Sequence, residues 1–190
     1  VPAEQTLSAL GAFRGVPENF GLLTLHRPSN VDDPKVLRRL VKTLVDLSDE
    51  LPMVFPIHPR TRSRIDEAGL NETLAQSRIA LTAPLGYLDL LGLMAESKLV
   101  LTDSGGLQEE TTALGVPCIT LRENTERPIT VEQGTNTIVG TDAEKIRRCF
   151  KDTLLTGGKS GRVPELWDGR AAYRIADILV DWVGSQVRAA

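Results

Sequence analysis

The most unusual segment of the sequence is a short loop with two glycines, Asp103-Ser104-Gly105-Gly106, between an apolar run and a helical pattern. Residues without a side chain let backbone N–H groups approach a ligand closely, and the start of the following helix carries a partial positive charge. The hydroxyl of Ser104 adds one more donor. These groups together suit a phosphate or a diphosphate. The alternative is a tight strand-to-helix turn in which both glycines serve backbone geometry alone.

Two charged residues are spaced to complete such a site. Glu110 follows the second glycine by four residues, about one helical turn on the same face, where its carboxylate can accept hydrogen bonds from a ribose diol. Arg127 stands before a proline in the next loop, where its guanidinium can make a bidentate phosphate contact. The alternative for Arg127 is a surface ion pair with Glu123 or Glu126, worth about 0–1 kcal/mol.

The two histidines of the chain, His26 and His58, each close a short apolar run. His26 can hydrogen-bond a phosphate oxygen or act as an acid or base near neutral pH, so we regard it as the catalytic candidate. A histidine at a strand end is more often structural, which is the alternative for both. Because neither has a further histidine or cysteine nearby, we expect no metal site, and no motif indicates a cofactor.

The elements that must position these residues alternate along the chain. Six short apolar runs predict strands over residues 21–26, 53–58, 78–82, 99–103, 116–121 and 135–140. Helical patterns cover residues 36–47, 61–68, 85–95, 105–114, a stretch capped by Asp142, and 170–187. This order predicts an α/β fold with a Rossmann-like, doubly wound parallel sheet. Pro56 argues against a central position for the second strand.

In such sheets ligands bind beyond the carboxyl ends of the strands, and the glycine loop, the charged loop and both histidines all follow strands. The chain has 190 residues, 41% hydrophobic, enough for one domain. Its net charge of −3 indicates neither nucleic acid nor an anionic membrane as partner. Cys118 and Cys149 are too few for a disulfide scaffold, which favours the cytoplasm.

Six segments in a fixed order carry a resemblance to a known family. They are LTLHRPSN, FPIHPRTR, APLGYLDLLGLM, DSGGLQEE, LGVPCITLRENTERPIT and GTNTIVG. Over about residues 20–140 the sequence resembles the carboxyl-terminal domain of the non-hydrolysing UDP-N-acetylglucosamine 2-epimerases. The resemblance implies one half of a GT-B fold, in which two Rossmann-like domains enclose a nucleotide sugar.

The same resemblance implies which part of UDP each residue would contact. Ser104, Gly105 and Gly106 would hold the diphosphate, Glu110 the ribose hydroxyls, and Arg127 and His26 would lie close to the phosphates.

Four further positions carry weaker implications. Leu85 and Leu90 would border the uracil, and this chain has leucines where family members often carry glutamine and phenylalanine. A contact at Leu85 would therefore run through its backbone. Arg27 and His58 fall where some bacterial members bind a second, activating UDP-sugar.

The implied reaction inverts C2 of UDP-GlcNAc to give UDP-ManNAc, by elimination and re-addition of UDP. In the family the carboxylates that transfer the protons lie on the amino-terminal domain. We therefore expect residues 1–190 to form a single UDP-binding domain that does not catalyse alone and that completes its site with that missing domain. The full-length protein is expected to be a homodimer.

Three other functions remain open at this stage. A GT-B glycosyltransferase would use the same nucleotide contacts but release UDP only with an acceptor. A non-catalytic module would bind a UDP-sugar and report it to a partner. A hydrolysing epimerase would release free ManNAc. The TERP segment and its spacing from DSGG favour the non-hydrolysing epimerase.

Overall fold

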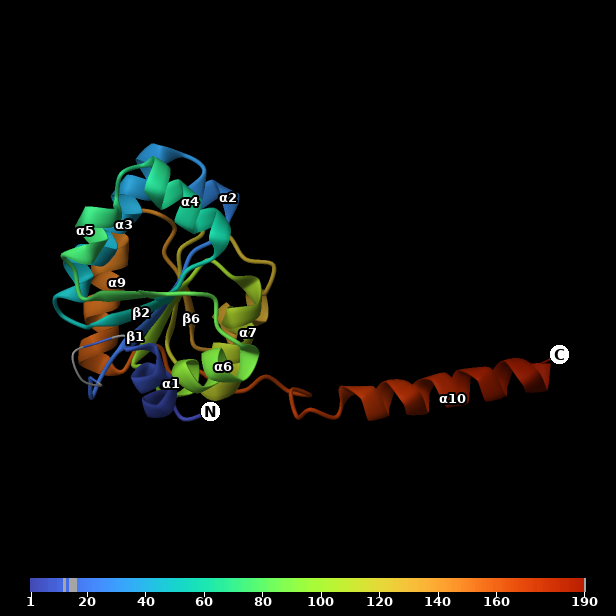
Figure 1. Ribbon diagram of the computed structural model, residues 1–190. Helices are drawn as coiled ribbons and strands as arrows, with labels where there is room; N and C mark the ends of the chain where they lie inside the picture. The colour runs from blue at the N-terminus through green and yellow to red at the C-terminus, as the bar shows by residue number, and fades with distance from the viewer. Residues whose placement is uncertain (12, 14–16, 190) are drawn as a thin grey trace.

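The computed structural model describes residues 1–11, 13 and 17–189, and its centre is one parallel β-sheet (Figure 1). The six strands are β1 (Gly21–Thr24), β2 (Met53–Pro56), β3 (Ile79–Thr82), β4 (Leu99–Thr102), β5 (Cys118–Thr120) and β6 (Asn136–Ile138). Their order in the sheet is β3-β2-β1-β4-β5-β6. All six predicted strands are confirmed, and so is the doubly wound topology.

The described residues also form helices, and all of these except the last lie around the sheet (Figure 1). They are α1 (Ala3–Leu10), α2 (Pro28–Val31), α3 (Pro34–Ser48), α4 (Pro59–Glu67), α5 (Asn71–Ala75), α6 (Tyr87–Glu96), α7 (Gly105–Leu114), α8 (Pro128–Glu132), α9 (Ala143–Thr156) and α10 (Ala171–Ala189). Alternate strand residues face opposite sides, so the strands feed two apolar cores. In β4, Leu99 and Leu101 join the core under α3 and α9, whereas Val100 joins the core under α1 and α6. Burial on both faces explains the continuous apolar runs in the sequence.

The helix ends follow the signals in the sequence. Asp33 accepts a hydrogen bond from the backbone N–H of Lys35 at the start of α3, where Pro34 is the first residue. Asp142 caps α9 as predicted, through the N–H of Lys145.

Pro56 does not place β2 at an edge, contrary to the expectation, because β2 lies between β1 and β3. Its pairing with β1 covers Met53 and Val54, so Pro56 lies beyond that pairing and no ladder bond to β1 is lost there. On the other side Ile57 continues the ladder, its N–H donating to the carbonyl of Thr82 at 3.0 Å.

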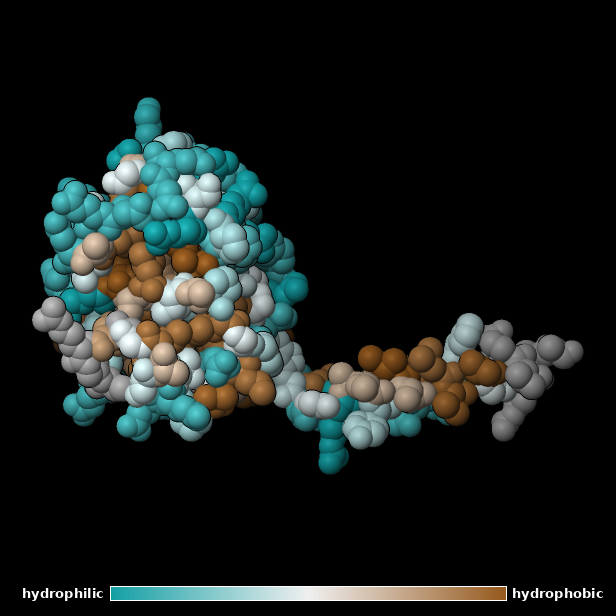
Figure 2. Space-filling view, in the orientation of Figure 1, coloured by the Kyte–Doolittle hydropathy of each residue, from teal (hydrophilic) through white to brown (hydrophobic). Residues whose placement is uncertain are grey.

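The last helix, α10, extends away from the domain after the segment 157–170 (Figure 1). Large apolar side chains of this helix are exposed, and Figure 2 shows hydrophobic residues along much of its length. They are Tyr173, Ile175, Ile178, Leu179, Val180, Trp182 and Val183. None of the helices in the described part of the chain has the length and apolar character needed to cross a membrane.

Candidate functional site

The predicted site residues gather where the strand order reverses, between β1 and β4. Loops that leave neighbouring strands at such a point run in opposite directions and open a crevice at the carboxyl edge of the sheet. Here the loop after β1 contains His26 and Arg27, and the loop after β4 contains Asp103 and Ser104. The two strands are also joined side by side at their ends, by a 2.6 Å hydrogen bond between the hydroxyls of Thr24 and Thr102.

A fully buried carboxylate, that of Asp103, fixes the geometry of this crevice. It accepts hydrogen bonds from the backbone N–H groups of His26 and Arg27, at 3.1 and 2.9 Å, and from the side-chain amide of Asn30 at 3.1 Å. Nδ1 of His26 lies 3.0 Å from the same carboxylate. Asn30 also donates to the carbonyl of Leu121, at 2.8 Å. The loop after β1 is thereby tied to the ends of β4 and β5.

The glycine loop is open to an incoming ligand. Gly105 and Gly106 do not have positive φ, and a Cβ added at either would find its nearest neighbours at 3.8–3.9 Å, an ordinary contact distance. Ser104 makes no side-chain cap to α7, in contrast to the aspartates that cap α3 and α9. The first N–H groups of a helix need partners from outside it. Nothing in the fold itself requires glycine here, so backbone geometry does not explain the pair.

Glu110 lies one turn further along α7 and is partly buried. Burial raises the pKa of its carboxyl group, and the charge of Glu109 acts in the same direction, while a hydrogen bond from Tyr87 opposes both. Tyr87 is exposed at the start of α6. A partly buried carboxylate with one hydroxyl donor retains lone pairs for two further donors, as a ribose diol would supply.

Arg127 forms an ion pair, but with a different partner from those expected. Its Nε lies 3.0 Å from Oε1 of Glu109, the fifth residue of α7, and both side chains are about 40–45% exposed. Glu126 is instead held by Arg122 in a bidentate pair at 2.6 and 2.7 Å, which lowers the pKa of the Glu126 carboxyl to about 2. The pairing with Glu109 brings Arg127 to the same end of α7 as the glycine loop.

The two histidines lie near each other, because the strands that they follow, β1 and β2, are neighbours in the sheet. Their ring centroids are 6.0 Å apart. His58 has a structural role, because its Nδ1 accepts the N–H of Arg60 and caps α4. His26 keeps 37% of its side chain exposed, and with Nδ1 turned to Asp103 its other ring nitrogen remains available to the crevice.

Leu85 and Leu90 are partly buried and pack against the core under α1 and α6. They stand at the start of α6, near Tyr87, which contacts Glu110. The structure thus brings the residues expected at the uracil and at the ribose to neighbouring positions.

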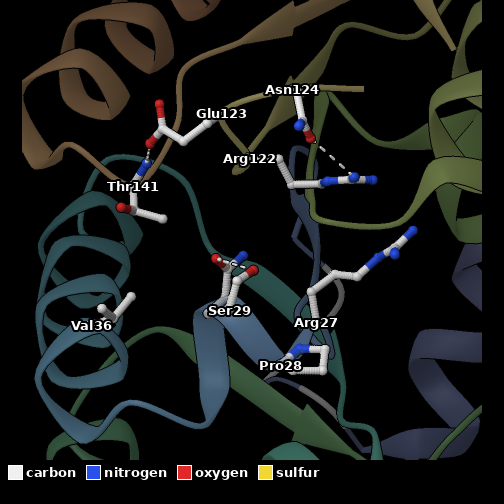
Figure 3. Close-up of a pocket in the computed structure, with 9 residues that line it drawn as sticks. Arg27, Pro28, Ser29, Val36, Arg122, Glu123, Asn124 and Thr141 are labelled. Atoms are coloured by element: carbon white, nitrogen blue, oxygen red, sulfur yellow. Dashed lines mark hydrogen bonds between the residues drawn. The ribbon is translucent and has the colours of Figure 1, made fainter. Parts of the chain in front are cut away.

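A pocket of about 440 Å³ adjoins the crevice (Figure 3). Arg27 and Arg122 extend toward the same side of it, with Ser29 below and Glu123 against Thr141. Arg27 connects the pocket to the glycine loop, since its Nη2 lies 3.8 Å from where a Cβ of Gly105 would be. The Nε of Arg27 is buried without a hydrogen-bond partner. An anion in the crevice would supply one.

Sequence reasoning did not assign roles to Asp103, Asn30 or Tyr87. The polar residues after β1 and β4 were the available signal for the first two. Among the described residues, no group of three or more His, Cys, Asp or Glu side chains is placed to hold a metal ion. Cys118 is buried in β5, and burial raises the pKa of its thiol to about 11, which fits a role in packing.

Comparison with known proteins identifies the family. The family model described as UDP-N-acetylglucosamine 2-epimerase matches residues 4–180. The chain belongs to this family. It is 46% identical over 140 residues to the UDP-N-acetylglucosamine 2-epimerase of Methanococcus maripaludis, covering 72% of this chain and 38% of that protein. It is 38% identical to the UDP-2,3-diacetamido-2,3-dideoxy-D-glucuronate 2-epimerase of Pseudomonas aeruginosa, covering 85% and 44% respectively.

A solved family structure has the same fold. The Methanocaldococcus jannaschii UDP-GlcNAc 2-epimerase, crystallised in complex with UDP-GlcNAc and UDP, matches with a TM-score of 0.81 and 38% identity. The match covers 93% of this chain and 48% of that one. The chain therefore spans about half the length, or less, of these family members, and its sheet corresponds to part of a GT-B structure.

Proposed function

We propose that this chain is the UDP-binding, carboxyl-terminal domain of a non-hydrolysing UDP-N-acetylglucosamine 2-epimerase. Residues 1–190 would hold the UDP moiety, and an amino-terminal domain would close over the sugar. The Methanocaldococcus jannaschii relative, whose structure contains UDP-GlcNAc and UDP, supports this ligand.

The observation that carries the proposal is the open glycine loop. Gly105 and Gly106 have torsions that any residue can adopt, and space for a side chain, yet both positions lack one. Close approach of a ligand to the backbone is the remaining physical reason for glycine. The uncapped start of α7, with Ser104 and Arg127 beside it, suits the two negative charges of a diphosphate.

In the proposed reaction the C1–O bond to UDP breaks as a base removes the proton from C2, which leaves a glycal. A proton then returns to the opposite face of C2 and UDP re-adds at C1. This chain would keep UDP bound between the two halves of the reaction. His26 would donate a hydrogen bond or a proton to the departing phosphate, with Asp103 setting the orientation of its ring.

Other expectations remain part of this proposal. Arg27 and His58 would contact a second, activating UDP-sugar, if this chain has the site found in some bacterial members. The full-length protein would be a homodimer. Both cysteines are free thiols, which supports a cytoplasmic location.

The sugar is the least constrained part of the substrate, because the contacts named above involve UDP. The relative from Pseudomonas aeruginosa, named for a diacetamido-glucuronate sugar, has the same 38% identity to this chain as the Methanocaldococcus jannaschii structure. A glycosyltransferase domain and a non-catalytic UDP-sugar-binding module remain the alternatives.

The test is to incubate the purified chain with UDP-GlcNAc in D2O, alone and with the amino-terminal half of a close family member. We expect no conversion by the chain alone, and with both halves UDP-ManNAc carrying deuterium at C2, detected by NMR. Turnover by the chain alone would contradict the proposed division of labour. UDP release that requires an added sugar acceptor would favour the glycosyltransferase. Binding of UDP-GlcNAc by both halves without any reaction would favour the non-catalytic module.

A further inference from the structure

Two buried side-chain amides lie between the glycine loop and the loop that contains Arg127. Gln108, on α7, and Asn136, at the start of β6, are both fully buried. Nδ2 of Asn136 donates to Oε1 of Gln108 at 3.1 Å. Oδ1 of Asn136 accepts the hydroxyl of Thr120 at 2.6 Å. Buried amides make hydrogen bonds only where partners are provided, so these contacts fix both orientations.

Gln108 contacts both loops that would hold the ligand. Its Nε2 donates to the carbonyl oxygen of Ser104, at 3.1 Å, on the glycine loop. Its Oε1 accepts the hydroxyl of Thr125, at 2.5 Å, on the loop after β5. One side chain therefore joins two loops, and Gln108 and Thr125 are 17 residues apart in sequence.

The backbone of Arg127 is held at both ends by the same group of residues. Its N–H donates to the hydroxyl oxygen of Thr125 at 2.9 Å. Its carbonyl accepts the hydroxyl of Thr130 at 2.7 Å, and Thr130 in turn accepts a hydrogen bond from Asn136 at 3.1 Å. Arg127 thus begins α8 in a backbone conformation, φ −125° and ψ 59°, that its neighbours determine.

We infer that Gln108 and Thr125 are positioning residues, which hold Arg127 in register with the glycine loop so that both contact one diphosphate. The inference rests on the proposed UDP site and adds to it a pair of residues outside the ligand contacts. A continuous series of hydrogen bonds runs from the Ser104 carbonyl through Gln108 and Thr125 to the Arg127 N–H. Breaking it at Gln108 or Thr125 removes the side-chain hydrogen bond that directly joins the two loops.

An unrelated role for this group would be to support the fold alone. Two of its features favour positioning. The contacts end on the backbones of Ser104 and Arg127, the residues expected at the phosphates. Thr125, the last side chain before the Arg127 N–H, is only partly buried and is not a core residue.

The experiment compares Thr125→Val, which keeps the shape and removes the hydroxyl, with Thr125→Ser, which keeps the hydroxyl. UDP and uridine affinities are measured by calorimetry on the 190-residue chain. We expect Thr125→Val to weaken UDP binding about tenfold and to leave uridine affinity unchanged. The UDP affinity of Thr125→Ser should stay within about threefold of wild type. Gln108→Met should weaken UDP binding as much as Thr125→Val does. The double variant should lose no more UDP affinity than either single variant.

A matched control and a ligand-free measurement complete the test. Thr43→Val removes another buried hydroxyl, bonded within α3 to the carbonyl of Arg39, and should leave UDP affinity unchanged. In the free protein, the amide NMR resonances of Gly105 and Gly106 should shift in Thr125→Val and not in Thr125→Ser. Unchanged glycine resonances, equal losses for UDP and uridine, or additive losses in the double variant would each overturn the inference. A wild-type chain that binds no UDP contradicts the proposed function, and the glycine resonances still decide this inference.

Discussion

Gly69 and Gly115 have positive φ, +67° and +73°, and each follows a helix, so a side chain there would strain the backbone. Gly105 and Gly106 show neither positive φ nor a close neighbour. The sequence does not separate these two uses of glycine, because torsion and local space are properties of the folded chain. At the residue scale, this difference supports the proposal that a ligand contacts the glycine loop.

Glu110 gives a prediction about pH. Burial raises the pKa of its carboxyl, so protonation begins at a higher pH than for an ordinary glutamate. A ribose diol donates to the charged form, and UDP affinity should therefore fall as pH falls through this raised pKa, by about five- to tenfold. Calorimetry from pH 8 to pH 5 on wild type and Glu110→Gln isolates the effect, because titration of the phosphates is common to both. Parallel profiles would show that Glu110 does not contact the ligand as a carboxylate.

The positions of individual site residues could be predicted where they depend on spacing within one element. The four-residue interval to Glu110 and the place of His26 after a strand are of this kind. The partner of Arg127 could not be predicted, because Glu109 approaches it from another element. The role of Gln108 was hidden for the same reason, since its partners lie on β6 and on the loop after β5.

At the scale of elements, the loops after β1 and β4 behave as one unit because Asp103 joins them. This carboxylate is fully buried and accepts donors from His26, Arg27 and Asn30. A buried charge is tolerated when several donors surround it. Rigid loops hold ligand-binding groups in place before the ligand arrives, which favours affinity.

Asp103→Asn should therefore destabilise the chain. The new NH2 group would face N–H donors where an oxygen now accepts them, and we expect a loss of about 2–3 kcal/mol in the free energy of unfolding. Urea denaturation measures it. Asp177→Asn, the same change at an exposed position on α10, should alter stability by no more than about 0.5 kcal/mol. Equal stability of the two variants would show that the hydrogen bonds to Asp103 contribute little to the free energy of unfolding.

The strands β1 to β5 could be predicted because their residues are mainly apolar on both faces, as in buried parallel strands. β6 is more polar, and its prediction depended on the longer run 135–140. The short helices α2, α5 and α8 were not predicted. They have four or five residues, too few for a helical period to show, and α2 and α8 each begin at a proline in a loop. The central place of Pro56 was missed because its effect depends on how far β1 extends beside β2.

At the scale of the whole molecule, α10 is the part least integrated into the domain. Seven apolar side chains, given above, are exposed along it (Figure 2). Contiguous exposed apolar surface of this kind favours association with another surface.

The chain should consequently self-associate as its concentration rises. Replacing Ile178 and Leu179 by lysine introduces charge into the exposed apolar row and should keep the chain monomeric in sedimentation velocity. Glu72→Lys with Gln76→Lys, at exposed positions on α5 and directly after it, is the matched control and should sediment as wild type does. A wild-type chain that stays monomeric at high concentration would contradict this prediction.

The most direct test of the account is a calorimetric titration of the chain with UDP, UMP and uridine, repeated on Gly105→Ala. We predict that UDP binds most tightly, and that the added methyl group weakens UDP at least tenfold without lowering the thermal unfolding midpoint, because its space is open in the free protein. Gly184→Ala, in open space on α10, should change neither the UDP affinity nor the thermal unfolding midpoint. UDP affinity equal to that of uridine, or unchanged in Gly105→Ala, would contradict a diphosphate site at this loop.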